Sequence, residues 1–198
     1  MIVHDNQPHA DLTRFYIATT DKLLEAKRLF SQGISSYMQH HLSWDEGSQL
    51  LQNSIRLYEQ ILREINLDTV NLYEYSKTSI EIRFITRVHL VASIYNDRNQ
   101  LDYTCMYLNK CIRILKMNLT SSCSSTTILL VDVLRKYAQT LFNCRKFDDA
   151  RRTIIEAQLL LDQMTPTSNL SINDDEKRTR GVLQTIEDLK AKCDLCLS

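Results

Sequence analysis

Residues 137–157 read YAQTLFNCRKFDDARRTIIEA, and the main fold prediction starts from this segment. Apolar or small side chains recur at intervals of three and four positions on both sides of a short polar stretch that ends at Lys146. This interval is the period of an α-helix. The segment therefore predicts two helices, over residues 128–143 and 147–164, that fold back on each other as an antiparallel hairpin.

The same segment orders its small and large apolar residues in a way that is typical of tetratricopeptide repeats. Small residues such as Ala138 and Ala150 let two helices cross closely, and large residues such as Leu141 and Ile154 fill the groove between them. A related order occurs 46 positions earlier, at Val91, Ala92, Tyr95, Leu101, Thr104, Leu108 and Cys111. We expect Ala26, Phe30 and Gly33 to form the same face of an earlier hairpin. Because the usual period is about 34 residues, we predict hairpins with extended helices or loops.

The helical period continues through the rest of the chain and predicts about seven helices in total. The other five are expected over residues 23–37, 43–62, 73–95, 101–116 and 174–195. Polar segments predict loops near 118–127 and 165–173, and a flexible N-terminus is expected over residues 1–9. We therefore predict a single all-α domain over residues 1–198, made of antiparallel helical hairpins that stack as a degenerate tetratricopeptide-like repeat.

The composition agrees with an all-helical chain. Glycine supplies 3 and proline 2 of the 198 residues, whereas average usage would supply roughly 12 per cent. Sheet proteins with several tight hairpins and proteins with dinucleotide or phosphate loops need more of both residues. Hydrophobic residues at 43% and charged residues at 24% are ordinary values for a domain with a buried core.

The charge balance argues against nucleic-acid binding. Lys plus Arg and Asp plus Glu number 24 each, so the formal net charge is zero, whereas nucleic-acid binders usually carry a basic excess. Acidic residues interrupt the local basic run, which comprises Arg145, Lys146, Asp148, Asp149, Arg151 and Arg152. The sequence contains neither a signal peptide nor the ~18 apolar residues of a membrane span. We expect a cytoplasmic protein that does not insert into membranes.

No motif in the sequence predicts catalysis. The metalloprotease pattern HExxH, the nucleophile turn GxSxG and a Gly-rich phosphate loop do not occur. The acidic pairs Asp148-Asp149 and Asp174-Asp175 begin polar helices, whereas acid–base catalysis needs carboxylates in a buried cleft. His40-His41 is best interpreted as part of a loop, because residues that could complete a metal site are poorly spaced. We predict a protein that is not an enzyme and binds no cofactor.

The chain has six cysteines: Cys105, Cys111, Cys123, Cys144, Cys193 and Cys196. Without a secretion signal, we expect free thiols or small buried apolar groups rather than disulfides. Cys193 and Cys196 form a C-x-x-C motif, but a structural zinc site needs two more ligands and no second pair exists. We favour two adjacent thiols without a metal, and a small metal protein or enzyme that uses this pair stays open as an alternative.

The nine tyrosines are the other unusual feature of the composition. Most are expected to line the helical core with their hydroxyls at its rim. Tyr73 and Tyr75 begin a helix directly after a predicted loop, and tyrosine is enriched at protein interfaces. These two residues are the better interface candidates.

The order of segments resembles the C-terminal region of the KIF-binding protein family. The likeness covers most of the chain and lies in scattered hydrophobic and alanine positions. Four stretches carry it: Phe15-Tyr16-Ile17 with Leu24 to Phe30, Gln52 to Tyr58, Leu67 to Leu72, and Arg83-Phe84 with Val91 to Asp97. Family members are considerably longer, and their N-terminal repeats have no counterpart here.

The resemblance implies an adaptor that binds a kinesin motor domain and regulates its attachment to microtubules and cargo transport, in a cytoplasmic and cytoskeleton-associated location. We place the partner contact at exposed residues around the loop after residue 66: Leu67, Val70, Leu72, Tyr73 and Tyr75. A helical-repeat subunit that acts as a scaffold in another multiprotein complex is the alternative function.

Overall fold

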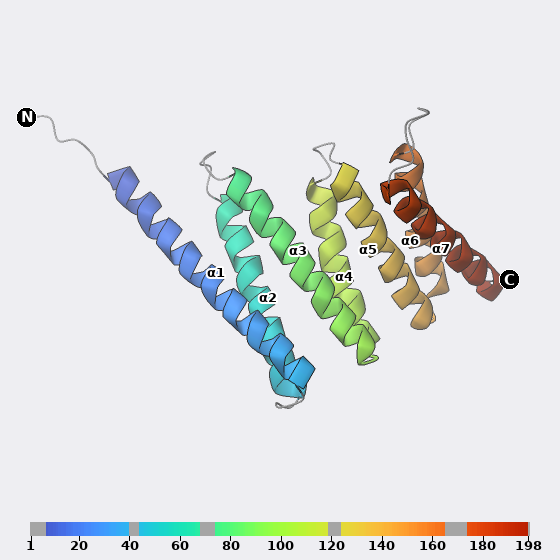
Figure 1. Cartoon of the computed structure of the whole chain (residues 1–198), viewed down its shortest axis with the longest axis horizontal. Helices are drawn as coiled ribbons and strands as arrows, with labels where there is room; N and C mark the ends of the chain where they lie inside the picture. Colours follow the sequence, from blue (N-terminus) through green and yellow to red (C-terminus); the bar gives the residue numbers. More distant parts are fainter. Residues whose placement is uncertain (1–6, 40–43, 68–73, 119–123, 165–173, 198) are drawn as a thin grey trace, which may run out of the picture. The chain divides into compact units, whose positions relative to one another are not determined.

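The computed structural model describes residues 7–39, 44–67, 74–118, 124–164 and 174–197. These residues form seven α-helices and no strand (Figure 1). The helices are α1 (Gln7–Gln39), α2 (Trp44–Leu67), α3 (Glu74–Asp97), α4 (Leu101–Asn118), α5 (Ser124–Asn143), α6 (Phe147–Met164) and α7 (Asp174–Leu197). The predicted all-α fold is confirmed, and the helices pack in consecutive pairs as a helical-repeat arrangement requires.

The boundaries differ from the prediction at two helix starts. α5 begins at Ser124, so residues 124–127 of the predicted loop 118–127 are helical. Serine and threonine often occupy the first positions of helices, where their hydroxyls can satisfy backbone N–H groups, and the polar run was therefore wrongly assigned entirely to the loop. α1 begins at Gln7, inside the segment 1–9 expected to be flexible. The predicted loop 165–173 lies outside the described residues.

Backbone contacts divide the chain into two compact units, residues 1–84 (unit 1) and residues 85–198 (unit 2). The boundary falls within α3, after Phe84. The single domain expected over residues 1–198 stays a prediction.

Unit 1 is built on the α1–α2 hairpin. The apolar face of α2 is buried as its helical spacing predicts, with Leu51, Ile55 and Tyr58 at 0–1% exposure. The Tyr58 ring lies 6.2 Å from that of Phe84 at the end of the unit. The buried Ser54 hydroxyl donates to the backbone oxygen of Ala26 at 2.6 Å, so its polar group has a partner in the core.

α1 and α2 approach most closely at Gly33. A Cβ added there would lie 2.7 Å from Cγ of Leu51 and 3.1 Å from the carbonyl oxygen of Gly47. Only a residue without a side chain fits at this separation of the two helices. The sequence predicted that Ala26, Phe30 and Gly33 share one face of this hairpin. Ala26 and Gly33 are buried on the side of α1 that faces α2.

Unit 2 holds the α5–α6 hairpin and, from residue 85 onward, the other hairpin predicted from the 46-residue repeat. α4 packs on α5, α5 on α6, and α7 on both α5 and α6. Most of the small and large repeat positions are buried, whereas Leu101 and Tyr137 are half-buried. The buried positions are Val91, Ala92, Tyr95, Thr104, Leu108 and Cys111 in the first copy, and Ala138, Leu141, Ala150, Ile154 and Ala157 in the second. Burying each large apolar side chain contributes about 1.5–3 kcal/mol. Tyr95 stacks on Tyr103 and Tyr107, with ring centroids 5.0 and 5.4 Å apart.

The turns of these two hairpins have the same backbone hydrogen bonds. Asn99 and Arg145, 46 residues apart, both have positive φ, 56° and 61°. In the first turn Gln100 N–H donates to Tyr95 O and Asn99 N–H to Asn96 O, both at 2.9 Å. In the second, Lys146 N–H donates to Leu141 O and Arg145 N–H to Phe142 O, also at 2.9 Å. Both turns are Schellman caps, so the repeat seen in the side chains extends to the main chain.

Candidate functional site

A cavity of about 260 Å³ lies between α3, α4 and α5 in unit 2. α3 contributes Ser93 and Asn96 from one helical face, and α5 contributes Arg135, Lys136 and Gln139 from another. Most of the residues that line the cavity have polar side chains, but the greater part of the lining surface is apolar, and Ala92 and Leu108 contribute to it. We refer to this cavity as the α3–α4–α5 pocket.

Each hydroxyl group that lines the pocket donates to the backbone carbonyl four residues earlier in the chain. Ser93 Oγ donates to the backbone oxygen of His89 at 3.2 Å, Thr104 Oγ1 to that of Gln100 at 3.1 Å, and Thr140 Oγ1 to that of Lys136 at 2.9 Å. A nucleophilic hydroxyl needs a base within hydrogen-bond reach. Because each of these protons is directed at a carbonyl group, the three hydroxyls present acceptor lone pairs to a ligand.

Four ionisable side chains meet at one side of the pocket. Arg135 donates to Asp132 at 2.9 Å, and Lys136 Nζ lies 3.7 Å from the other oxygen of Asp132. The same Lys136 ammonium lies 2.8 Å from Nε2 of His89 on α3. An ammonium group has only donors, so His89 accepts this bond through an unprotonated Nε2 and carries its proton on Nδ1.

The environment shifts the pKa values of His89 and Asp132. Burial lowers the pKa of His89, and the adjacent Lys136 ammonium lowers it further. Burial opposes ionisation of Asp132, but the hydrogen bond from Arg135 and the charges of Lys136 and Arg135 outweigh it and hold the pKa of Asp132 below its ordinary value. His89 is therefore neutral at pH 7, and Asp132 is ionised between two cations.

The pocket can thus bind a polar ligand that has both donors and acceptors. Asn96 and Gln139 each offer an amide oxygen and an amide N–H₂, and the Gln139 amide already donates to Asn143 at 3.1 Å. Lys136 and Arg135 add donors, while Asp97 adds an acceptor to the lining. The charges on the lining and on Asp132 nearly balance, so the pocket is not a site for a strongly charged ligand such as a polyphosphate.

The residues predicted as a partner contact belong to unit 1 and to the segment after α2. Leu67 is the last residue of α2, and Tyr75 is the second residue of α3. Val70, Leu72 and Tyr73 lie outside the described residues. This predicted contact and the α3–α4–α5 pocket have no residue in common.

The two thiols of the C-x-x-C motif lie about one helical turn apart on α7 and differ in exposure. Cys193 is buried on the inner side of α7, and Cys196 is exposed. Burial raises the pKa of the Cys193 thiol. Within the described part of the chain, no group of three or more His, Cys, Asp or Glu side chains could hold a metal ion. His40 and His41 lie outside the described residues.

Three tyrosines line the core as predicted, but the Tyr58 hydroxyl is buried and does not lie at the rim of the core. Tyr58, Tyr95 and Tyr107 are at most 2% exposed, whereas Tyr103 is 45% exposed.

The basic run around Arg145 is an ordinary surface, as predicted, because Arg151 pairs with Asp194 at 2.7 Å and Arg152 with Asp149 at 3.2 Å. No helix in the described residues is long and apolar enough to cross a membrane.

His89, Asp132, Arg135 and Lys136 were not identified from the sequence. A signal for two of them exists, since His89 and Arg135 are 46 positions apart and so occupy equivalent places in the two repeats. Equivalent positions on the first helix of consecutive hairpins face the same side of a helical stack. If the 46-residue offset is applied to polar as well as apolar residues, it predicts that His89 and Arg135 lie on the same side of the helical stack.

We compared the chain with models of protein families, with functionally characterised proteins and with solved structures, and found no match in any of the three comparisons. The resemblance to the KIF-binding protein family therefore rests on the four stretches quoted above. Any functional conclusion depends on the geometry of the described residues.

Proposed function

We propose that this chain is a non-enzymatic protein-interaction module that receives an extended segment of a partner protein in the α3–α4–α5 pocket. The observation that supports this proposal is the pocket lining, which combines amides, cations and hydroxyl acceptors. A peptide backbone presents the complementary N–H and C=O groups. All three hydroxyl protons are directed at backbone carbonyl groups, which favours binding over catalysis.

The size of the pocket also favours a peptide segment. Sites for drug-sized ligands and cofactors have volumes of about 300–1,000 Å³, and this cavity has about 260 Å³. Such a volume suits one or two residues of a longer chain, with the rest of the segment lying along α3 and α5. A nucleic-acid ligand is disfavoured by the zero net charge of the protein.

For the partner, we propose the motor domain of a kinesin. The support is the sequence resemblance, which implies a cytoplasmic adaptor that regulates attachment of the motor to microtubules and cargo transport. In this proposal, Leu67, Val70, Leu72, Tyr73 and Tyr75 provide a second contact with the motor domain. A module with two separate contacts gains affinity when both are engaged at once.

The pocket is tested by a matched pair of glutamine substitutions. Gln139 in the pocket donates to Asn143 at 3.1 Å, and Gln184 on exposed α7 donates to Asp188 at 3.1 Å, so both lose the same kind of i,i+4 bond on substitution. We expect Asn96→Ala combined with Gln139→Ala to weaken partner binding at least tenfold, because two hydrogen bonds to the segment are lost. Gln184→Ala should leave affinity unchanged. Equal affinities for all three proteins in a titration with the recovered partner would reject the pocket as the binding site.

The partner is tested with purified kinesin motor domains. We expect saturable binding to the full chain, measured at two salt concentrations, and displacement by microtubules. Tyr73→Ala combined with Tyr75→Ala should weaken binding if the predicted loop takes part. If no motor domain binds and a pull-down recovers only other proteins through the pocket, the kinesin proposal fails and the interaction module stands.

A scaffold subunit of another multiprotein complex is the second candidate. The observation that favours it is the solvent side of α4, where Tyr103, Met106 and Met117 are 41–68% exposed and lie on one helical face. Exposed apolar side chains on one face often mark contacts with another subunit. Aggregation of the isolated chain, relieved by Met106→Lys combined with Met117→Lys, would favour this function over that of an adaptor.

A further inference from the structure

Lys136 connects two helices at the wall of the α3–α4–α5 pocket. It belongs to the pocket lining on α5, and its ammonium nitrogen lies 2.8 Å from Nε2 of His89 on α3. The same ammonium lies 3.7 Å from an oxygen of Asp132, one helical turn earlier on α5. The position of Lys136 in the pocket wall is therefore set by an acceptor on one helix and a carboxylate on another.

The contact between Lys136 and His89 requires a neutral imidazole. Nε2 of a neutral imidazole can accept a hydrogen bond, whereas an imidazolium has an N–H donor on both nitrogen atoms. Protonation of His89 would therefore place two donors and two positive charges at the observed distance of 2.8 Å. Like charges repel strongly at such a separation, so the two side chains have to move apart.

His89 lies among charged groups that α5 provides. Lys136, Asp132 and Arg135 all act on its charge. On α3 itself, Asp97 lines the same pocket about two helical turns further along. The residues that α4 contributes to the pocket are a threonine and a leucine, which carry no charge. Asp132 is thus the carboxylate that attracts a proton to His89, and the two cations oppose it.

Asp132 determines which side chain leaves when His89 is protonated. Arg135 donates to Asp132 at 2.9 Å and keeps this carboxylate in the cluster. The other oxygen of Asp132 lies 3.7 Å from the Lys136 nitrogen, which is too far for a hydrogen bond. An imidazolium donates a strong hydrogen bond to a carboxylate, so His89 can replace Lys136 beside this oxygen. Lys136 is half-buried on a flexible four-carbon stem and can extend toward solvent.

We propose that His89 is a pH-sensitive switch in the α3–α4–α5 pocket, in which uptake of one proton by the imidazole releases Lys136 and opens the link between α3 and α5. In the closed state, neutral His89 holds the ammonium in the pocket wall. In the open state, the imidazolium pairs with Asp132 and Lys136 extends into solvent. One proton is gained, and no bond between heavy atoms forms or breaks.

The switch is closed at pH 7. Burial lowers the pKa of His89, and the Lys136 ammonium lowers it further, so the open state is populated on the acidic side of pH 6.5. Burial opposes ionisation of Asp132, but the hydrogen bond from Arg135 and the nearby cations hold the pKa of Asp132 below its ordinary value. The carboxylate is therefore still charged when His89 takes up its proton.

The consequence for partner binding rests on the proposed function of the pocket. A segment that contacts Lys136 in the closed wall binds the form of the protein in which His89 is neutral. Its affinity then falls with the fraction of neutral His89. This fraction changes about tenfold between one pH unit above and one pH unit below the midpoint of the His89 titration. By reciprocity, a bound segment should lower that midpoint.

NMR titration of the folded full chain tests the switch without a partner. We expect the imidazole signals of His89 and the side-chain amide signals of Asn96 and Gln139, both in the pocket lining, to shift with the same midpoint. In His89→Gln, the two amides should keep their positions over this pH range. Amide signals that shift equally in wild type and His89→Gln, or that do not follow His89 in the wild type, would overturn the proposal.

A pair of lysine substitutions tests the contact itself. Lys136→Met keeps most of the aliphatic stem and removes the cation, so the midpoint of His89 should rise. Lys192→Met, at an exposed position of α7, is the matched control and should leave the midpoint unchanged. Equal midpoints in both variants and the wild type would show that Lys136 does not contact His89 in the native fold.

The effect on binding is tested with N-acetylalanine N-methylamide, a probe that presents two peptide groups. We expect this probe to bind the wild type about tenfold more weakly one pH unit below the His89 midpoint than one unit above, and His89→Gln equally at both. If binding does not depend on Asn96 and Gln139, the proposed function fails and the NMR titration alone decides the switch. If binding depends on these two residues but has the same pH profile in His89→Gln, the switch fails and the binding site stands.

Discussion

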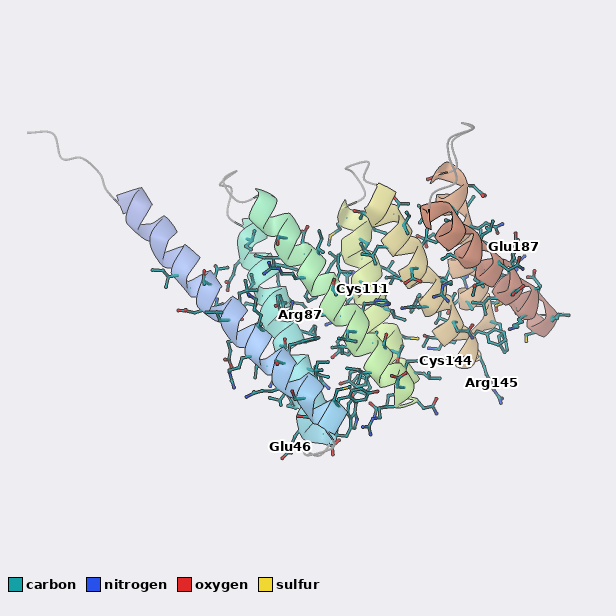
Figure 2. The ribbon with its side chains drawn as sticks, viewed as in Figure 1. Glu46, Arg87, Cys111, Cys144, Arg145 and Glu187 are labelled. Atoms are coloured by element: carbon teal, nitrogen blue, oxygen red, sulfur yellow. The ribbon has the colours of Figure 1, made fainter. Side chains whose placement is uncertain are left out.

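Arg145 has a backbone conformation that few residues with a side chain adopt. Its φ of 61° lies in the left-handed region, which costs a non-glycine residue about 1–2 kcal/mol. Its side chain is exposed and extends away from the ribbon in Figure 2. The turn is therefore held by its main-chain hydrogen bonds and by packing of the helices it joins.

We predict that Arg145→Gly stabilises the protein. Glycine adopts positive φ without strain, but it also loses more conformational freedom on folding, so the net gain is about 0.5–1 kcal/mol. Asn99→Gly at the equivalent position should gain less, since asparagine tolerates this region better. Urea unfolding of the three proteins provides the test. A lower stability of Arg145→Gly would mean that the arginine side chain makes a contact that outweighs the strain.

His89 makes stability depend on pH. Its pKa in the folded state lies below the value of 6.5 that it has in an unfolded chain. Below about pH 6.5 the unfolded state binds more protons than the folded state, so the free energy of unfolding falls as the pH falls through this window. Asp132 stays ionised in this window, because its pKa lies below its ordinary value.

His89→Gln tests this assignment. Glutamine can accept the hydrogen bond from Lys136, and it does not titrate. We expect thermal unfolding between pH 5 and 7 to show a shallower loss of Tm toward acid for the variant than for the wild type. Parallel curves for the two proteins would assign the pH dependence to other residues.

The α1–α2 pair depends on how closely two helices approach at Gly33. A methyl group added there meets Leu51, which is fully buried and has little space to move. Overpacking a core costs about 1–3 kcal/mol, and alanine returns about 1 kcal/mol in helix propensity. We expect Gly33→Ala to destabilise the protein by about 1 kcal/mol.

Gly181 offers a matched control in another helix. No atom lies within 4 Å of a Cβ added at this exposed position of α7. Gly181→Ala should therefore stabilise the protein by up to about 1 kcal/mol through helix propensity alone.

In a Leu51→Ala background, Gly33→Ala should lose its cost, and a double-mutant cycle by urea unfolding measures this coupling. A cost that persists in that background would locate the strain elsewhere than at Leu51.

The helices were more predictable than the pocket for a physical reason. Apolar periodicity follows from which face of a helix is buried, so positions such as Val88, Val91 and Ile94 could be assigned from spacing alone, and all three are buried. The start of α5 was harder to predict from the Ser-rich run before residue 128, because serine and threonine favour both loops and helix starts. The polar residues of the α3–α4–α5 pocket come together only when the three helices pack, and no local pattern encodes that packing.

For the whole molecule, the predicted function comes from a sequence resemblance, whereas the pocket was found only in the structure. The predicted partner contact and the pocket involve different residues. The contact predicted around residues 67–75 depends on a segment that lies largely outside the described residues. The pocket depends on side chains whose meeting requires the register of three helices. A sequence reading based on apolar residues could find the hairpins but not the polar groups that they bring together.

The two caps at Asn99 and Arg145 have a consequence for how such a chain can change in length. The hydrogen bonds of both caps are made by main-chain atoms, and the side chains of the two turns differ. The turn between the two helices of a hairpin therefore does not depend on residue identity at most of its positions. A duplicated unit of 46 residues would bring its own joint and its own buried alanines. Growth or loss by whole hairpins therefore leaves each remaining hairpin with a complete turn, whereas a deletion that removes part of a turn would leave one helix without its cap.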